Sequence, residues 1–461
     1  MKKIIFTGLI LSVLTAISCQ NESSDSTTNT RDSLKLTTYK FPERTKKSNI
    51  YEVNIRQYTP EGTFKAFEAH IPRLKKTGVD ILWLMPIFPI SEKNRKGTLG
   101  SYYAVADYKK VNPEFGTEED LHNLIKTAHK DSMLVILDWV ANHTGWDNPW
   151  ITEHPEWYTH DSTGHIVSPV PDWTDVADLN YDNKDMRNEM VNSMKYWVEN
   201  FDVDGFRCDV AMMVPTDFWD STRIELDKIK PVFMLAEAEQ TDLTEKAFDM
   251  NYAWNFHHIM NQIAKGEKNA EDLRKYFEKD QKEYPQEVYR MSFTSNHDEN
   301  SWNGTVFERM PDSYKTFAAL TFVAPGMPLI YSGQEAGLNK RLRFFDKDTI
   351  DWSNLEMQDF YAKLIQIKKE NPALWNGKAG SPAYFINTSN PEQILAFKRI
   401  KNDNNILVIM NLSNKDAKFH FTEKDSEKAY LNYFTGKEIK IKPQENYNLK
   451  PWEFKILIKN N

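Results

Sequence analysis

The stretch Val203-Asp204-Gly205-Phe206-Arg207-Cys208-Asp209-Val210-Ala211 decides the fold, because it has the pattern of a strand with two different faces. With a period of two, the apolar residues Phe206 and Cys208 fall on one face, and Arg207 and Asp209 fall on the other. The apolar face fits a wall of helices. The polar face places a guanidinium group beside a carboxylate near the end of the strand. Such a pair either fixes a sheet or keeps a carboxylate nucleophile ionised.

Other short apolar runs along the chain also have the pattern of strands, and amphipathic helices separate several of them. The expected strands are Ile50–Ile55, Val79–Met85, Met133–Trp139, Val203–Ala211, Val232–Glu237, Phe248–Trp254, Tyr289–Thr294 and Met327–Tyr331. Eight mostly apolar strands with helices between them predict an α/β fold, the closed (β/α)8 or TIM barrel. A chain of 461 residues is too long for one compact core, so we expect a smaller domain in addition.

Polar side chains gather where the expected strands end, which is where (β/α)8 barrels carry their active sites. They are Asp138, Asn142 and His143 after the third strand, Arg207 and Asp209 on the fourth, Glu237 and Glu239 after the fifth, His297 and Asp298 after the seventh, and Glu335 after the eighth. One polar strand end would mean little, since buried polar groups often serve packing. Carboxylates at the ends of four strands, with two histidines nearby, are hard to assign to packing alone.

The chemistry of this set is that of carboxylates, imidazoles and one arginine. No Cys/His set has zinc spacing, no glycine-rich loop suits a phosphate, and the net charge of −8 with no basic run argues against nucleic acid. The set fits glycoside hydrolysis, in which one carboxylate attacks the sugar and a second carboxyl group protonates the leaving oxygen. Asp209, beside Arg207, suits the nucleophile. Glu237 suits the acid, and spacing alone leaves Glu239 open as an alternative.

These segments together resemble the α-amylase superfamily of glycoside hydrolases, over nearly the whole mature chain. The resemblance rests on Asp138…Asn142-His143, Gly205-Phe206-Arg207-Cys208-Asp209, the glutamate after the fifth strand, Asn296-His297-Asp298, Asp178-Leu179-Asn180 and Gly100-Ser101-Tyr102-Tyr103…Asp107-Tyr108. Four separate motifs in the family's order make the match specific, whereas any one of them alone would be weak.

The resemblance implies a role for each matched residue. It implies that Asp209 is the nucleophile, Glu237 the acid/base, and Asp298 the third carboxylate, which steadies an oxocarbenium-like transition state. Sugar-binding roles are implied for Tyr103, His143, Arg207 and His297: a stacking platform, two hydrogen-bonding histidines, and an arginine that orients the nucleophile. Asp138 is expected to be a supporting hydrogen-bond partner.

The resemblance also implies a small domain inserted after the third strand and a C-terminal antiparallel β-sandwich. The second fits the alternating runs Ile394–Ile400, Ile406–Leu412 and Phe454–Ile458. The expected organisation is a signal peptide at 1–19, a flexible tether at 20–47, barrel at 48–141, insertion at 142–180, barrel at 181–378 and sandwich at 379–461.

Two departures from the family bear on calcium. Where calcium-dependent α-amylases carry a Lys-His pair after the nucleophile, this chain has Met212 and Met213. Asn142 is the only residue that matches a calcium ligand of the family, although Asp172 and Asp175 are in reach in principle. The expectation is therefore a weak or absent calcium site and no required cofactor. In the family, this lysine helps to bind the glucose of the leaving group, so its loss leaves open which sugars the enzyme prefers on that side.

The start of the chain has the pattern of a lipoprotein signal. Lys2-Lys3 precedes an apolar run from Ile4 to Ile17, and Ala16-Ile17-Ser18-Cys19 resembles a bacterial lipobox, imperfect at Ile17. Lipidation of Cys19 would anchor the protein to the cell envelope, at the outer membrane, the surface or the periplasmic face, and would leave Cys208 without a disulfide partner. An ordinary signal peptide is the alternative.

The sequence thus predicts a lipid-anchored enzyme that hydrolyses α-glucosidic bonds, most simply α-1,4 bonds, in starch-like oligo- or polysaccharides with retention. A member that cleaves α-1,6 bonds or transfers glucanosyl groups would use the same carboxylates. A non-catalytic glucan-binding or transport subunit is the alternative from another class, and the presence of Asp209, Glu237 and Asp298 argues against it. The sequence predicts no oligomeric state.

Overall fold

The computed structural model describes residues 41–423, 428–442 and 444–459. The expected signal peptide and Cys19 lie outside these residues. Within the described ranges, no helix combines the length and the apolar character needed to cross a membrane.

The expected flexible tether, 20–47, is wrong at its end, because α1 (Phe41–Thr45) is a helix and the Thr45 side chain is buried. The amide side chain of Asn376 donates a 2.8 Å hydrogen bond to the Thr45 carbonyl oxygen. The Asn376 backbone N–H donates at 2.7 Å to the carbonyl oxygen of Lys46. These bonds hold residues 45 and 46 on the folded chain, and a composition rich in polar residues could not reveal them.

The barrel consists of eight strands in the described part of the chain, and each expected strand contains one of them. They are β1 (Ile50–Val53), β2 (Ile81–Leu84), β3 (Leu134–Trp139), β6 (Gly205–Cys208), β7 (Phe233–Ala236), β8 (Met250–Tyr252), β9 (Tyr289–Ser292) and β10 (Met327–Tyr331). The strand order β1-β10-β9-β8-β7-β6-β3-β2 closes on itself, since β1 pairs in parallel with both β2 and β10. The predicted (β/α)8 barrel is confirmed.

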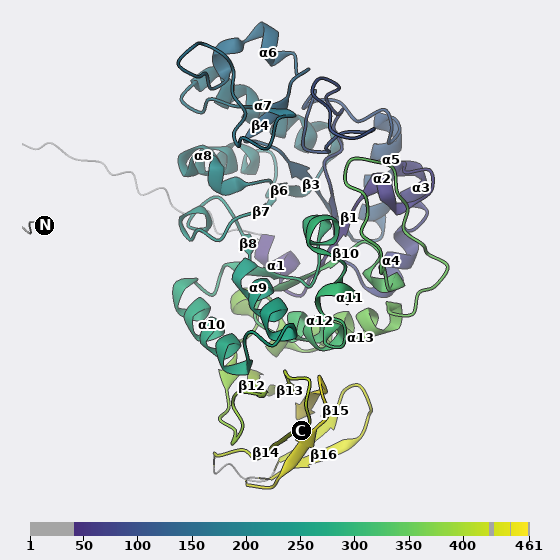
Figure 1. Cartoon of the computed structure of the whole chain (residues 1–461), viewed down its shortest axis with the longest axis vertical. Helices are drawn as coiled ribbons and strands as arrows, with labels where there is room; N and C mark the ends of the chain where they lie inside the picture. Colours follow the sequence, from purple (N-terminus) through teal and green to yellow (C-terminus); the bar gives the residue numbers. More distant parts are fainter. Residues whose placement is uncertain (1–40, 424–427, 443, 460–461) are drawn as a thin grey trace, which may run out of the picture. The chain divides into compact units, whose positions relative to one another are not determined.

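Helices follow the strands along the chain and surround the barrel (Figure 1). The longer ones are α4 (Ile71–Thr77), α5 (Glu118–Lys130), α7 (Lys184–Phe201), α8 (Thr216–Asp227), α9 (Trp254–Ala264), α10 (Ala270–Glu283), α12 (Tyr314–Val323) and α13 (Gln358–Glu370). The short ones are α2 (Ile55–Tyr58), α3 (Phe64–Glu68), α6 (Trp150–Glu153) and α11 (Val306–Arg309). The methionines of α7 are buried in the core between helices and barrel, as expected of an amphipathic helix.

Strand β6 has the two faces that its sequence predicts. Phe206 and Cys208 are buried in the core shared with the helices, whereas Arg207 points into the barrel, where its guanidinium contacts Trp83. A Cβ atom on Gly205 would lie 1.9 Å from the carbonyl oxygen of Phe233, so only glycine lets β6 lie this close to β7. The strand ends sooner than expected, because Val210 turns into the left-handed region with φ 36°.

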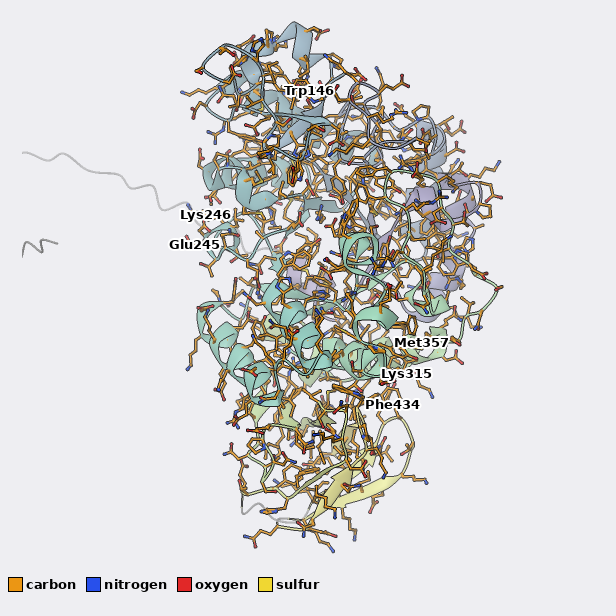
Figure 2. All side chains as sticks on the ribbon, viewed as in Figure 1. Trp146, Glu245, Lys246, Lys315, Met357 and Phe434 are labelled. Carbon is orange, nitrogen blue, oxygen red and sulfur yellow. The ribbon has the colours of Figure 1, made fainter. Side chains whose placement is uncertain are left out.

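An insertion and a C-terminal domain complete the fold. Between β3 and β6 the chain forms the antiparallel pair β4 (His143–Gly145) and β5 (Val176–Asp178). The C-terminal strands are β11 (Tyr384–Phe385), β12 (Ile394–Lys401), β13 (Asn404–Asn411), β14 (Ala417–Phe419), β15 (Lys428–Asn432), β16 (Glu438–Ile441), β17 (Tyr447–Leu449) and β18 (Phe454–Lys459). They form antiparallel sheets in the orders β11-β12-β13-β18-β15-β16 and β14-β17, as predicted for the sandwich. Phe434 of this domain, labelled in Figure 2, packs against Phe360 of α13 with ring centroids 5.9 Å apart.

Candidate active site

Arg207 lies at the centre of one group of carboxylates at the end of β6. Its Nη1 donates hydrogen bonds of 2.8 Å to Asp138 and 2.9 Å to Asp209. Its Nη2 forms an ion pair of 2.9 Å with Glu237, without the alignment of a hydrogen bond. Since Arg207 is fully buried, one guanidinium group is shared by three carboxylates away from bulk water.

Asp209 follows β6 directly, and 11% of its side chain is exposed. Burial raises the pKa of the Asp209 carboxyl well above its usual range, whereas Arg207 acts in the opposite direction. Arg207 therefore favours the ionised form of Asp209, as the sequence pattern predicts, and it does so against the cost of burial.

Glu237 and Glu239, which spacing could not separate, lie in different surroundings. Glu237 is next to Arg207, and its carboxylate accepts a 2.8 Å hydrogen bond from the backbone N–H of Val210. Glu239 instead accepts hydrogen bonds of 3.0 Å from Arg290 and 2.9 Å from the Asn255 side chain. The geometry brings Glu237, and not Glu239, to Asp209.

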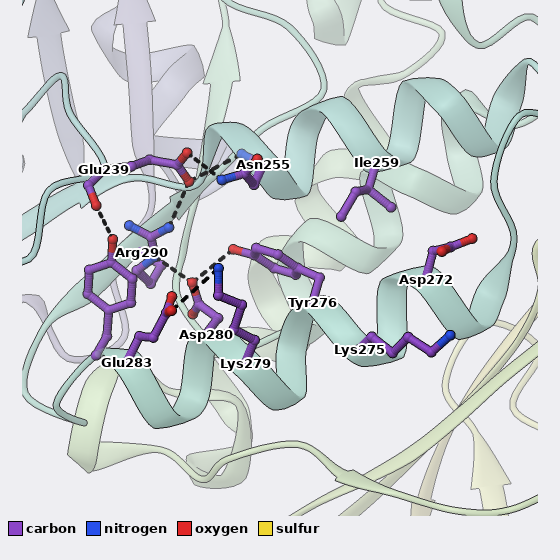
Figure 3. Close-up of a pocket in the computed structure, with 11 residues that line it drawn as sticks. Glu239, Asn255, Ile259, Asp272, Lys275, Tyr276, Lys279, Asp280, Glu283 and Arg290 are labelled. Atoms are coloured by element: carbon purple, nitrogen blue, oxygen red, sulfur yellow. Dashed lines mark hydrogen bonds and ion pairs between the residues drawn. The ribbon is translucent and has the colours of Figure 1, made fainter. Parts of the chain in front are cut away.

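The surroundings of Glu239 form a separate polar pocket against α9 and α10 (Figure 3). The Tyr284 hydroxyl also donates to the backbone carbonyl oxygen of Glu239, and Arg290 forms a second ion pair with Asp280. These contacts hold the loop after β7 on its outer side. Glu239 therefore supports the loop that carries Glu237.

Asp138 and Tyr103 are joined by a hydrogen bond next to Arg207. Asp138 is fully buried and accepts hydrogen bonds from Arg207, from the Trp83 indole at 3.1 Å and from the Tyr103 hydroxyl at 3.0 Å. Three donors bind its two oxygens, so it suits the expected supporting role. The ring of Tyr103 is stacked on that of His297, with centroids 5.5 Å apart.

His297 lies at the centre of a second group of carboxylates. Its Nδ1 is 2.5 Å from Glu52, and its Nε2 is 3.3 Å from Asp298 and 2.8 Å from the Tyr103 hydroxyl. Burial acts to lower the pKa of His297, but Asp298 and Glu52 outweigh it and raise that pKa to about 9. The imidazole is therefore charged at neutral pH and its two N–H groups both donate.

Glu52, on the inward face of β1, is the main residue of the candidate active site that the sequence analysis missed. It is fully buried and one carboxylate oxygen has no hydrogen-bond partner. A signal existed, since a charged residue in the apolar run Ile50-Tyr51-Glu52-Val53 is unusual and would need a partner. That partner, however, lies 245 residues away in the chain.

His143 differs in charge from His297, although both were predicted to bind sugar. Burial lowers the pKa of His143 to about 3, so this imidazole is neutral. It lies next to Tyr103, whose backbone it contacts, and its ring is 5.5 Å from that of Trp173. The described contacts of His143 include none of the three predicted catalytic carboxylates.

The residues considered for calcium each have protein partners in the structure. The Asn142 amide is paired with His143 at 3.3 Å. The ammonium group of Lys96 lies 2.9 Å from Asp175 and donates at 2.7 Å to the carbonyl oxygen of Asp172, so a lysine already supplies positive charge there. Among the described residues, no group of three or more His, Cys, Asp or Glu side chains could hold a metal ion.

Comparison with known proteins places this site in a family. Residues 39–418 match the family model described as "Alpha amylase, catalytic domain", and residues 384–456 match "Maltogenic Amylase, C-terminal domain". The first match covers most of the chain. The chain therefore belongs to the α-amylase family of glycoside hydrolases, and it is an enzyme of that type.

Individual relatives agree with this assignment. A maltogenic α-amylase of Bacillus acidopullulyticus is 26% identical over 86% of this chain and 70% of its own length. Alpha-amylase 3 of Dictyoglomus thermophilum is 27% identical over 86% of this chain and 91% of its own. The crystal structure of a maltogenic α-amylase from Thermotoga neapolitana is 30% identical, with a TM-score of 0.84 over 91% of this chain and 100% of that one.

Proposed function

We propose that this enzyme hydrolyses α-1,4-glucosidic bonds in starch-like oligo- or polysaccharides with retention of configuration. Asp209 attacks the anomeric carbon and forms a covalent glycosyl-enzyme. Glu237 protonates the leaving oxygen and then, as a base, activates the water that releases the sugar.

The observation that carries this proposal is the guanidinium group shared by Asp209 and Glu237. Each carboxylate lies 2.9 Å from a nitrogen of Arg207. Retaining glycosidases hold their two carboxyl groups roughly 5–5.5 Å apart, whereas inverting enzymes leave roughly 6.5–9.5 Å for a water molecule. Contact with one small planar group supports the shorter spacing.

The charge balance of the site supports the same chemistry. Asp138, Asp209 and Glu237 share Arg207, and Glu52 and Asp298 share His297. Carboxylates thus outnumber cations in a buried region. Those carboxylates that are ionised favour the positive charge that develops on a sugar ring during glycoside cleavage.

Related activities are distinguished by the bond cleaved and by the acceptor. The relatives include proteins named cyclomaltodextrinase and α-1,4-glucan:maltose-1-phosphate maltosyltransferase. Met212 and Met213, which are 46% and 40% exposed, supply no cation on the leaving-group side for a charged acceptor. The product analysis below therefore has to decide between water and a sugar as the acceptor.

Product analysis on amylose, pullulan and a cyclodextrin tests the proposal. We expect shortened α-1,4 products whose first-formed anomer is α by NMR, without maltotriose from pullulan. Release of maltotriose would show α-1,6 cleavage, and products longer than the substrate would show transfer. The Asp209→Asn protein, purified in parallel, controls for contaminating amylases, and wild-type protein without activity on any of the three would contradict the proposal.

We propose in addition that Cys19 is lipidated and anchors the enzyme to the cell envelope. The support is the charged start and the apolar run that ends at Cys19. A single acyl chain binds membranes only marginally, so stable attachment requires the full lipoprotein modification. Cys19→Ala should move the protein out of the membrane fraction or leave it unprocessed, and an unchanged distribution would contradict lipidation.

A further inference from the structure

Two buried cations, where the barrel meets the C-terminal sheet, have no carboxylate partner among the described residues. Arg399 lies on β12 and Lys368 on α13, and each is 1% exposed. Both side chains donate hydrogen bonds to backbone carbonyl oxygens, at 2.7–3.4 Å. These oxygens belong to Val323 and Trp375 for Arg399, and to Gly326 and Leu374 for Lys368.

The surroundings of Arg399 are an exception in the described part of the chain. Each of the other buried arginines has a carboxylate oxygen within 3.8 Å of its guanidinium group, and these are Arg56, Arg207, Arg223, Arg290 and Arg309. Buried charges are paired as a rule, because an uncompensated charge in the protein interior is costly. Carbonyl oxygens carry partial charges, so they compensate Arg399 only in part.

The charge that needs a partner is that of Arg399. Burial, together with the nearby Arg399, lowers the pKa of Lys368 well below its usual range, so this lysine can lose its proton. Burial lowers the pKa of Arg399 to about 9, which leaves the guanidinium group charged at neutral pH. No carboxylate contributes to either shift.

A small pocket lies beside Arg399. It has a volume of about 90 Å³, and Gly326, Gly377, Ser381 and Pro382 are among the residues that line it with Arg399. The Nε atom of Arg399 is buried and has no hydrogen-bond partner. A water molecule needs roughly 10–15 Å³ by such a measure, whereas pockets for drug-sized ligands have roughly 300–1,000 Å³. The pocket therefore has room for a small ion and a few waters.

The other charged residues of this pocket are engaged with each other. Asp280 and Arg290 also line it, and a carboxylate oxygen of Asp280 lies 3.0 Å from Nε of Arg290. Asp280 accepts a further hydrogen bond, of 3.0 Å, from the Tyr276 hydroxyl. Asp280 is not among the groups that shift the pKa of Arg399. It therefore does not supply the negative charge that Arg399 lacks.

The pocket lies away from the predicted catalytic residues. Val288 and Gly326, which line it, come shortly before β9 and β10, whereas Asp209, Glu237 and Asp298 come after the strands β6, β7 and β9. The pocket is thus at the end of the barrel opposite to the candidate active site, and its occupant is not the substrate.

We propose that the pocket beside Arg399 binds a small monovalent inorganic anion, which supplies the missing negative charge. Arg399 belongs to the C-terminal sheet, whereas Val288 and Gly326 belong to the barrel, so the anion joins these two parts of the fold. Its binding stabilises the folded protein, because the unfolded chain has no such pocket. This inference does not depend on the proposed function.

Thermal unfolding in two salts of equal ionic strength tests the proposal. Sodium gluconate, whose anion is too bulky for the pocket, is replaced stepwise by sodium chloride. The Tm of the wild-type protein should rise by about 2–4 °C and then level off. In Arg399→Met this rise should disappear. Lys398→Met is the matched control, since it removes a positive charge from the next residue of β12, on the opposite face, and it should keep the rise.

Bromide gives a second readout, which needs no variant and decides the matter if Arg399→Met does not fold. Anomalous diffraction from wild-type crystals soaked in sodium bromide should show a peak within hydrogen-bonding distance of the Arg399 guanidinium group. Absence of that peak, an equal wild-type Tm in both salts, or a rise that Arg399→Met shares would overturn the anion site. Failure of the proposed function is a separate result, because these measurements contain no sugar.

Discussion

The two sides of the candidate active site balance their buried carboxylates with different cations. On one side, Arg207 contacts Asp138, Asp209 and Glu237. On the other, His297 lies between Glu52 and Asp298. A guanidinium group stays charged at every pH at which the protein is folded, whereas an imidazole gains and loses its proton. The positive charge that Arg207 places next to Asp209, the predicted nucleophile, therefore does not change with pH. The charge on the His297 side does change with pH.

Asp209→Asn is the change that should have the largest effect. A neutral amide cannot form the glycosyl-enzyme ester, so kcat should fall by at least roughly 10⁴-fold while the fold is kept. Initial rates on amylose and circular dichroism measure the two quantities. Appreciable turnover in this variant, with contamination excluded, would show that Asp209 is not the nucleophile.

Arg207→Lys should have the second largest effect, because it keeps the charge but removes the planar group that three carboxylates share. One ammonium group cannot replace these contacts, so we expect kcat to fall roughly 100-fold and the free energy of unfolding to fall by about 2–3 kcal/mol. Urea denaturation and rate measurements test this. Activity like that of the wild type would mean that charge alone, without geometry, is sufficient on this side.

Glu52→Gln should change the pH response of the other side. Loss of the Glu52 charge should lower the pKa of His297 from its value of about 9, because Glu52 is one of the groups that raise it. His297 has a raised pKa in the folded state, so its stabilising contribution is fully present below the unfolded value of roughly 6.5 and is lost as the pH rises through about 9. In the variant, this contribution should be smaller, and its loss should be complete at a lower pH.

Nitrogen-15 NMR of histidine-labelled protein measures the titration of His297 directly, and the alkaline limb of the pH–activity profile should move in the same direction. His257 is an internal control, since it is paired with Glu299 at 3.1 Å and not with Glu52. An unmoved His297 titration in Glu52→Gln would show that Glu52 does not set its charge.

The smallest expected effect is that of a chelator. We propose that calcium is dispensable, because Lys96 already neutralises Asp175 and contacts Asp172, the acidic residues that an ion would need. The melting temperature should be the same with excess chelator and with added calcium. A large fall in the chelator, restored by calcium, would show a structural ion.

The strands of the barrel could be predicted from sequence because each is a short apolar run, and the active-site region because polar residues end those runs. This local information locates Asp209 and Glu237 near the same edge. It does not distinguish Glu237 from Glu239, since the distinction comes from Arg290 and Asn255, which approach from other elements. Contacts between residues that are distant in the chain decide which of the two glutamates lies next to Asp209.

The same reason explains the other differences between expectation and structure. Glu52 is bound by a histidine that follows β9, and the ring of that histidine is stacked on Tyr103, which follows β2. The expected strand over 203–211 is too long, since apolar alternation continues past Cys208 although the backbone turns at Val210. Periodicity predicts which face a side chain occupies, but it contains no information on where a positive φ interrupts the strand.

Val210 has a consequence for any attempt to make this enzyme more heat-resistant. A β-branched residue at φ 36° stores strain of roughly 1–3 kcal/mol, which glycine would release. Yet the backbone N–H of this residue donates to Glu237 at 2.8 Å, so the strained turn also aims the group that holds Glu237. Glycine keeps this N–H, so a gain in heat resistance at this position requires that the turn itself, and not the valine side chain, be preserved.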